Sequence, residues 1–506
     1  MTASRRSFLA RAAAGGGMWA NGGVPMLSGL SAVSAQEATV NPREVQLQPE
    51  IEPLVQLIED TPRATLLEEI ALRIRQGTSY REVLAALFLA GVRNVQPRPS
   101  VGFKFHAVLV VNSAHLASLS SPNQDRWLPI FWALDHFKGS QARDVREGNW
   151  TLSAVNESAV PSSTHAVSSF QLAMDGWDEE QADTAVAGLA RNYGSQSLFE
   201  LFARYGMRDF RSIGHKAIFV SNAFRTLNCI GWRHAEPVLR SLAYALLNHE
   251  GAPNPAQSDL EADRPWRQNQ AIAQQIRPEW LDGRIDDGAS LGLLDTLRHA
   301  TPSDASQYVA GLLNDGISAQ SVYDGLFLSA GEMLMRQPGI VALHASTTTN
   351  AMRYAFNTTG SDLTRRLLLL QNAAFLTMFR EAMKKRGTVG SDRLDDLKPV
   401  DNFARGVQIQ DVFRDLHEQP NHSARRMLGY LQSGGSAHHV IDQARRLVFL
   451  KGTDSHDYKF SSAVLEDFYH VSPRFRDYCL AASVFKLHGA DEQDNGLVER
   501  IRTVLS

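Results

Sequence analysis

The spacing of apolar residues along the chain predicts a protein built almost entirely of α-helices. After residue 48, hydrophobic positions recur with the period of about 3.6 residues that places them on one helix face. Thr61-Pro62 and Thr301-Pro302 each place a cap and a first-turn proline before such a series, and Ser79 with Glu82 forms a capping-box pattern before another. No run of alternating polar and apolar residues predicts strands. We therefore expect an all-α fold.

Four segments of the chain share one layout, in which a histidine opens an expected helix and a small polar residue follows about two turns later. The histidines are His106, His215, His344 and His456, and the polar residues are Asn112, Asn222, Asn350 and Ser462. A turn and a second amphipathic segment follow each, at 127–137, 236–247, 363–379 and 475–485. We expect about four helical-hairpin repeat units packed around a central pocket.

The first 35 residues have the pattern of an export signal. Ser4-Arg5-Arg6-Ser7-Phe8-Leu9 is a twin-arginine sequence, with Arg5 and Arg6 as the pair, and Val33-Ser34-Ala35 resembles a cleavage site. The stretch between them is too polar and too rich in glycine to remain as a spanning helix. We expect the twin-arginine translocase to export the folded protein, cleavage after Ala35, and a periplasmic or secreted location.

The remaining chain, 36–506, is expected to form a single all-helical repeat domain. Prolines, glycines and polar residues interrupt the helical pattern near 148–163, 251–288 and 386–402, which we interpret as insertions. No later segment reaches 18 apolar residues without charges, so no stable membrane span is expected. The formal net charge of −3 argues against nucleic acid as a partner.

The motifs of several common protein classes are missing from the sequence. Cys229 and Cys479 are the only cysteines, and no CxxC or CxxCH occurs, which excludes zinc ribbons and covalently attached haem. We expect both thiols to be free rather than bridged. No P-loop, G-x-S-x-G or strand-linked G-x-G-x-x-G is present in the mature chain, so a nicotinamide-binding domain or an ordinary esterase is not expected.

The four repeated histidines are the strongest candidates for chemistry. If the units are related by rotation, the histidines share one helix end and point into one pocket. Imidazole is the commonest metal ligand, and it suits iron, copper, zinc and nickel. We predict His106, His215, His344 and His456 as ligands of a transition metal, iron or copper. The alternative is that each histidine caps or packs at the start of its helix.

A dense cluster of titratable residues surrounds His456. It runs from Asp454 to Lys459, and His456 and Lys459 share a helix face because they are three residues apart. A lysine in this position can act as a general acid or orient an oxygen-bearing substrate. The alternative is a helix start whose acids stabilise the helix dipole.

The expected roles of these residues divide into two groups. His456, Lys459 and His344 are predicted to be catalytic. His106, His215, Asn222 and Asn350 are predicted to bind the substrate. Two other polar pairs, Asp135-His136 and His234 with Glu236, are expected to be solvated or to cap helices.

Three of the repeat segments are similar to the questin oxidase family. The similarity lies in 343–352 followed by 367–379, in 454–465 followed by 480–483, and in 214–218. It implies an oxidoreductase, with a Baeyer–Villiger-type oxygen insertion that opens an anthraquinone ring. We therefore expect an exported monooxygenase-like enzyme that acts on a small aromatic or hydrophobic substrate.

Two other functions stay open at this point. One is a non-catalytic periplasmic helical protein that binds a hydrophobic ligand in the same pocket. The other is a metal-dependent hydrolase, which needs a carboxylate beside the histidines. Asp135, Glu236 and Asp454 are the candidates for that carboxylate.

Overall fold

The protein is seen here in a computed structural model that describes residues 43–97, 105–247, 253–400, 409–414, 416 and 418–506. The expected export signal, with Arg5, Arg6 and Ala35, lies outside these residues. The described ranges form 22 α-helices, several short 3-10 helices and no strand beyond two isolated bridges. The predicted all-α class is therefore confirmed.

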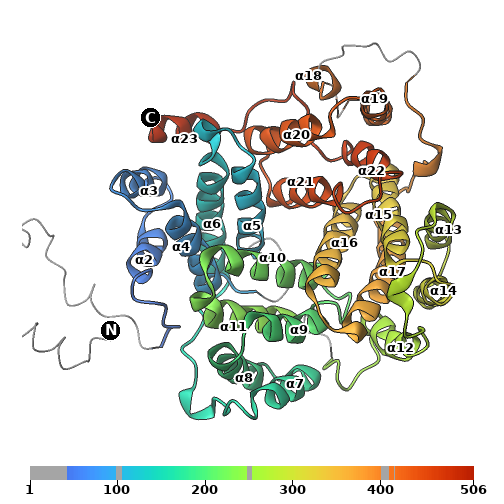
Figure 1. Cartoon of the computed structure of the whole chain (residues 1–506). Coiled ribbons are helices and arrows are strands. Elements are labelled where there is room, and N and C mark those ends of the chain that lie inside the picture. The colour runs from blue at the N-terminus through green and yellow to red at the C-terminus, as the bar shows by residue number, and fades with distance from the viewer. Residues whose placement is uncertain (1–42, 98–104, 248–252, 401–408, 415, 417) are drawn as a thin grey trace, which may run out of the picture.

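Four helices form a ring at the centre of the molecule (Figure 1). They are α5 (His106–Leu119), α10 (His215–Ile230), α16 (Ile340–Thr358) and α21 (Ser455–Asp467). Each contacts the next, and α21 contacts α5 to close the ring. Most of their residues are buried around the whole helix, as expected for helices enclosed by others. These are the helices that carry the four repeated histidines.

A second helix packs against each member of the ring. These helices are α6 (Leu128–Glu147), α11 (Ala235–Leu246), α17 (Asp362–Lys384) and α22 (Arg476–Ser483). They contact α5, α10, α16 and α21 respectively. Their bounds overlap the four amphipathic segments that the sequence pattern placed after the histidines.

The other helices surround these pairs. The N-terminal group is α2 (Glu52–Asp60), α3 (Leu66–Arg75) and α4 (Tyr80–Asn94). Between α6 and α10 lie α7 (Ala166–Gly176), α8 (Glu179–Asn192) and α9 (Ser195–Gly206). Between α11 and α16 lie α12 (Arg264–Ala273), α13 (Asp287–Leu297), α14 (Pro302–Asn314) and α15 (Ala319–Arg336). The last group is α18 (Ile409–Val412), α19 (Pro420–Gln432), α20 (Ala437–Lys451) and α23 (Leu497–Leu505).

Part of the region 251–288 is helical, although its composition suggested a connection. Helix α12 begins there at Arg264-Pro265 and buries Trp266, Ile272 and Ala273. Proline is well placed in the first turn of a helix because that turn leaves its N–H groups unpaired. The apolar residues on one face then give the segment a surface to pack. The regions 148–163 and 386–402 contain only short 3-10 turns among their described residues.

Cys229 and Cys479 are both free and half-buried, as expected for the thiols. In the part of the chain that the structure describes, no helix combines the length and the apolar character needed to cross a membrane.

Candidate metal centre

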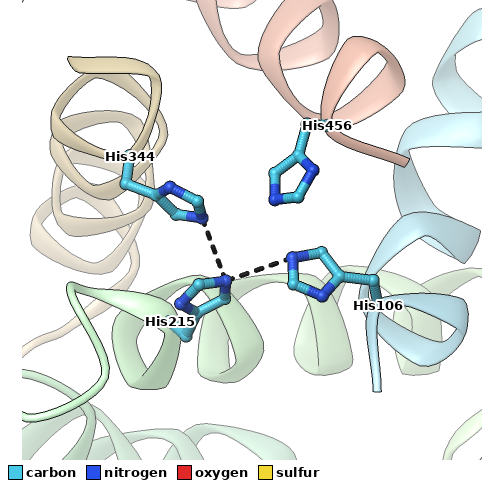
Figure 2. Close-up of side chains that lie close together, drawn as sticks. All are labelled: His106, His215, His344 and His456. Carbon is cyan, nitrogen blue, oxygen red and sulfur yellow. Dashed lines mark hydrogen bonds between the residues drawn. The ribbon is translucent and has the colours of Figure 1, made fainter. Parts of the chain in front are cut away.

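The four repeated histidines meet inside the ring of helices. His106, His215, His344 and His456 are all buried, and one nitrogen atom of each lies within 4.8 Å of the corresponding atom of every other. Figure 2 shows the four imidazoles turned toward a common point, each from a different ring helix. Residues separated by more than 100 positions thus form one cluster, as the internal resemblance predicted.

The helix geometry explains why the rings converge. His106 and His215 are the first residues of α5 and α10, and His456 is the second residue of α21. Side chains on a helix tilt toward its N-terminus, so histidines in the first turn point past the helix end. The expectation that each histidine opens its helix is wrong for His344, because α16 begins four residues earlier at Ile340, after Gly339. One helical turn keeps His344 on the same inward face.

Three of the imidazoles are held by their Nδ1 atoms. His215 Nδ1 lies 2.7 Å from the Ser212 carbonyl oxygen, and His344 Nδ1 lies 2.6 Å from the Ile340 carbonyl oxygen. His456 Nδ1 lies 2.6 Å from Asp454 Oδ1. A carbonyl oxygen only accepts hydrogen bonds, so each Nδ1 that faces one must carry a proton. Neutral rings fixed in this way present the lone pair of Nε2 to the centre of the cluster.

The Nε2 atoms of His215 and His344 lie at hydrogen-bond distance although neither carries a proton in its neutral ring. His215 Nε2 is 3.0 Å from His344 Nε2 and 3.2 Å from His106 Nε2. Because the Nδ1 atoms of His215 and His344 already hold the protons of the neutral rings, their Nε2 lone pairs face each other. Burial also lowers the pKa values of both histidines well below the usual value, which disfavours extra protons. A metal ion between the nitrogens would remove this repulsion.

Two of the nitrogen–nitrogen distances, 3.0 and 3.2 Å, suit neighbouring ligands of a single ion. Neighbouring imidazole ligands at about 2.1 Å from a metal and about 90° apart have nitrogens about 3 Å from each other. The group contains four neutral nitrogen ligands and no carboxylate. Such a set suits iron, copper, nickel or zinc rather than magnesium or calcium. The four buried histidines are therefore compatible with a transition-metal site.

Lys459 lies one turn after His456 on α21 and is buried. Its Nζ has no hydrogen-bond partner among the described residues. Burial lowers the pKa of this amino group to about 7, so it exchanges protons near neutral pH. When charged, Lys459 further lowers the pKa values of His215, His344 and His456, which places the amino group within electrostatic reach of the cluster.

Asp454 combines a capping role with a contact to the cluster. Its side chain caps α21 in a capping box with Asp457, so the interpretation of this segment as a stabilised helix start is correct. The same Oδ1 accepts the hydrogen bond from His456 Nδ1, and that bond holds the pKa of Asp454 well below its usual range. A carboxylate in this position fixes the ring and raises the basicity of the inward nitrogen.

We expect Asp454→Asn to weaken metal binding by about 10- to 100-fold, because loss of a carboxylate bonded to a metal-binding histidine has this effect. Competition with a chelator of known affinity measures the change. Asp457→Asn is the matched control, since Asp457 belongs to the same capping box but its carboxylate bonds to the Thr453 and Asp454 N–H groups and lies beside His488 rather than bonding to the His456 ring. Equal weakening in the two variants would assign the effect to the helix cap instead.

The two asparagines predicted to bind substrate lie elsewhere. Asn222 is seven residues after His215 on α10, roughly 10 Å along the helix. Its Nδ2 donates to the Leu109 carbonyl oxygen at 3.0 Å, which ties α10 to α5. Asn350 Nδ2 lies 2.9 Å from Glu466 Oε2 and 2.7 Å from Asp467 Oδ1, which ties α16 to α21. Both amides therefore connect helices of the ring.

Asp467 provides a test of this connection. The carboxyl is buried, and burial raises its pKa well above the usual value. When an acid has a higher pKa in the folded than in the unfolded state, the folded protein loses stability as the pH rises above the unfolded pKa of about 4. Asn keeps an acceptor for Asn350 without the charge. We expect Asp467→Asn to raise the melting temperature at pH 7 by about 2 °C or more, and the gain to shrink as the pH falls toward 4. A gain that does not change between these pH values, measured by thermal unfolding, would contradict this explanation.

The carboxylates that a hydrolase would need do not join the cluster. Asp135 forms a two-point ion pair with Arg63, and Glu236 forms one with Arg191. Asp454 contacts only the outward nitrogen of His456. None of the three belongs to the group of converging ligand atoms.

Some residues of the site had no signal in the sequence. The carbonyl groups of Ser212 and Ile340 orient two imidazoles, and any residue type can supply a carbonyl. Gly214 has a φ of +80°, and a Cβ at this position would overlap Thr348 on α16. The Gly214-His215 pair could have suggested a tight turn before the helix. His136, expected to be solvated or capping, instead has a buried Nε2.

Comparison of the chain with protein-family models, curated protein sequences and solved structures gives no match.

Proposed function

We propose that this protein is an exported metal-dependent oxidoreductase, similar in activity to the questin oxidase family. The observation that carries the proposal is the convergence of four buried imidazole nitrogens in a cluster without a carboxylate. His106, His215, His344 and His456 would hold iron or copper. Such an ion supplies the activation of dioxygen that oxygen insertion requires.

The architecture we propose is a repeat of four helical hairpins, each with a ring helix and its packed partner. The contacts of α5 with α6, α10 with α11, α16 with α17 and α21 with α22 support this interpretation. In such an arrangement each unit contributes one histidine to a shared site. A buried ion then bonds to all four units and stabilises the folded form over the unfolded one.

The roles of the surrounding residues follow from their contacts. The Ser212 and Ile340 carbonyls and Asp454 fix three imidazoles in the tautomer that binds a metal. Lys459, buried and without a hydrogen-bond partner, would donate to the oxygen atom that gains negative charge during the reaction. The substrate we propose is a small aromatic or quinone-like molecule.

The export of the protein is also a proposal. Arg5 and Arg6 support transport of the folded protein by the twin-arginine translocase, with cleavage after Ala35 and a periplasmic or secreted location. A metal centre formed from four distant segments requires a folded chain. Export in the folded state would allow the metal to be inserted first.

The proposal is tested with metal-loaded protein, an added two-electron reductant such as ascorbate, which reduces the second oxygen atom of dioxygen to water, and a panel of hydroxyanthraquinones and simpler hydroxyquinones. We expect dioxygen uptake, and a product that contains one more oxygen atom than its substrate by mass spectrometry. Tight binding of a quinone to metal-free protein, with no dioxygen uptake in any form, would support a ligand-binding protein instead.

A further inference from the structure

A second polar region lies at the surface, next to the segment that carries His456. A cavity of about 650 Å³ is bounded by the start of α3, by α6, by the segment before α21 and by α23. Its lining includes Trp132, Asp135, His136, Thr453 and Arg500. Thr453 directly precedes Asp454, whose side chain is 53% exposed although it bonds to buried His456. At this point only the partly exposed side chain of Asp454 separates His456 from solvent.

Three buried polar atoms on α6 and α21, the helices that carry His136 and His456, have no hydrogen-bond partner among the described residues. They are His136 Nε2, Tyr458 Oη and Lys459 Nζ. Buried polar groups are almost always hydrogen-bonded, to protein or to ordered water. A run of such atoms beside a cavity is the kind of surface that bound water satisfies.

Ring contacts and charge show that these groups are neighbours. The Trp132 indole stacks on His136, with ring centroids 4.9 Å apart, and on Tyr458, with centroids 4.2 Å apart. The Lys459 ammonium lowers the pKa of His136 as well as those of His215 and His344. Lys459 is therefore within electrostatic reach of both the cavity wall and the metal centre.

We propose that water and protons reach the four-histidine centre from this cavity, and that His136 passes the protons along the route. The proposal rests on the metal-dependent function proposed above, whose oxygen chemistry consumes protons. An imidazole can take a proton at one ring nitrogen from a hydronium ion in the cavity, which leaves water, and release a proton at the other nitrogen to the neutral amine of Lys459. No other bond is formed or broken in this transfer.

Burial, more than the surrounding charges, keeps the resting state of His136 neutral. Burial is the largest influence and lowers the pKa of His136 to about 4. The charged groups that face this histidine or line its cavity are Asp135 on α6, Arg63 before α3, Asp454 and Lys459 at α21, and Arg500 on α23. Arg63 is neutralised by Asp135, and Arg500 by Glu68. A neutral imidazole can both accept and donate, as a relay requires.

The route can be tested without a substrate. Paramagnetic Cu(II) strongly accelerates the relaxation of bulk water protons when those protons exchange with the metal site and only weakly when they diffuse past it, and Zn(II)-loaded protein gives the diamagnetic background. His136→Phe keeps the ring that stacks on Trp132 but removes the nitrogens. We expect this variant to bind one Cu(II) and to lose the copper-dependent relaxation, whereas His136→Gln retains much of it.

His234→Phe is the matched control. His234 lines a different cavity of about 650 Å³, and burial lowers its pKa to about 4 as well. We expect its substitution to leave the relaxation unchanged. If His136→Phe does not fold, His136→Leu carries the same expectation.

The outcomes separate this inference from the proposed function. Unchanged relaxation in His136→Phe, or equal loss in His234→Phe, overturns the relay. Wild-type protein with one copper per chain and no relaxation above the Zn(II) background overturns the route but leaves the metal centre intact. Protein that binds neither copper nor iron overturns both, and if only iron binds, the iron-loaded protein replaces the copper-loaded protein in the same measurement.

Discussion

Gly214→Ala should lower the stability of the protein by roughly 3 kcal/mol or more and abolish metal binding. Gly214 adopts a φ of +80°, which costs a residue with a side chain about 1–2 kcal/mol. An added Cβ would also overlap Thr348 Oγ1 and lie 2.9 Å from Thr348 Cβ, inside the buried face of α16. Relief of the overlap must move either α16, which carries His344, or the start of α10, which carries His215.

Two comparisons isolate the close approach to Thr348. Gly77 also has a positive φ, of +109°, but no atom lies within 4 Å of the position that an added Cβ would take. Gly77→Ala should therefore lower the stability by only about 1–2 kcal/mol and leave metal binding intact. Adding Thr348→Ala to Gly214→Ala should recover part of the lost stability. Chemical unfolding and metal analysis of these variants and the wild-type protein give the values. If Gly214→Ala binds metal as well as Gly77→Ala does, the close approach does not position His215.

Replacement of His344 or His456 by alanine should abolish turnover while the protein remains folded. Each substitution removes one Nε2 ligand. We expect the metal affinity to fall by roughly 100-fold or more, because the loss of a ligand should weaken binding at least as much as the loss of a residue that only orients a ligand. The folded state should persist because the loss also removes a repulsion between buried lone pairs. Dioxygen uptake measures the turnover, and circular dichroism follows the fold.

His115→Ala is the control for these two variants. His115 lies on the same ring helix as His106 but points to Tyr80, whose hydroxyl is 2.9 Å from His115 Nδ1. We expect it to keep both metal and activity. Turnover that survives in His344→Ala and in His456→Ala would show that the cluster is not the reaction centre.

The sequence could predict the fold class and the four histidines because both depend on local patterns. The helical period of the apolar residues defines most helices, and a histidine in the first turn of a helix tends to point past its end. The repeated layout then suggested that His106, His215, His344 and His456 share a site. Their convergence within 4.8 Å agrees with that prediction.

Contacts between distant segments account for what the sequence could not predict. Gly214 meets Thr348, and Asn350 bonds to Asp467, although each pair is more than 100 residues apart. The sequence predicts Asn350 as a substrate ligand, and what it could not predict is that this amide joins two ring helices through Asp467. His136 was expected to be solvated, and only the packing of α6 against α21 through Trp132 and Tyr458 buries its Nε2.

The central claim is that four neutral imidazoles hold one transition-metal ion. It is tested most directly by elemental analysis, together with an absorption spectrum, of protein purified from the cells that produce it. We predict one iron or copper per chain, which is lost when all four histidines are replaced by alanine. Wild-type protein that is fully folded, free of metal and unable to bind iron or copper on addition would contradict the account.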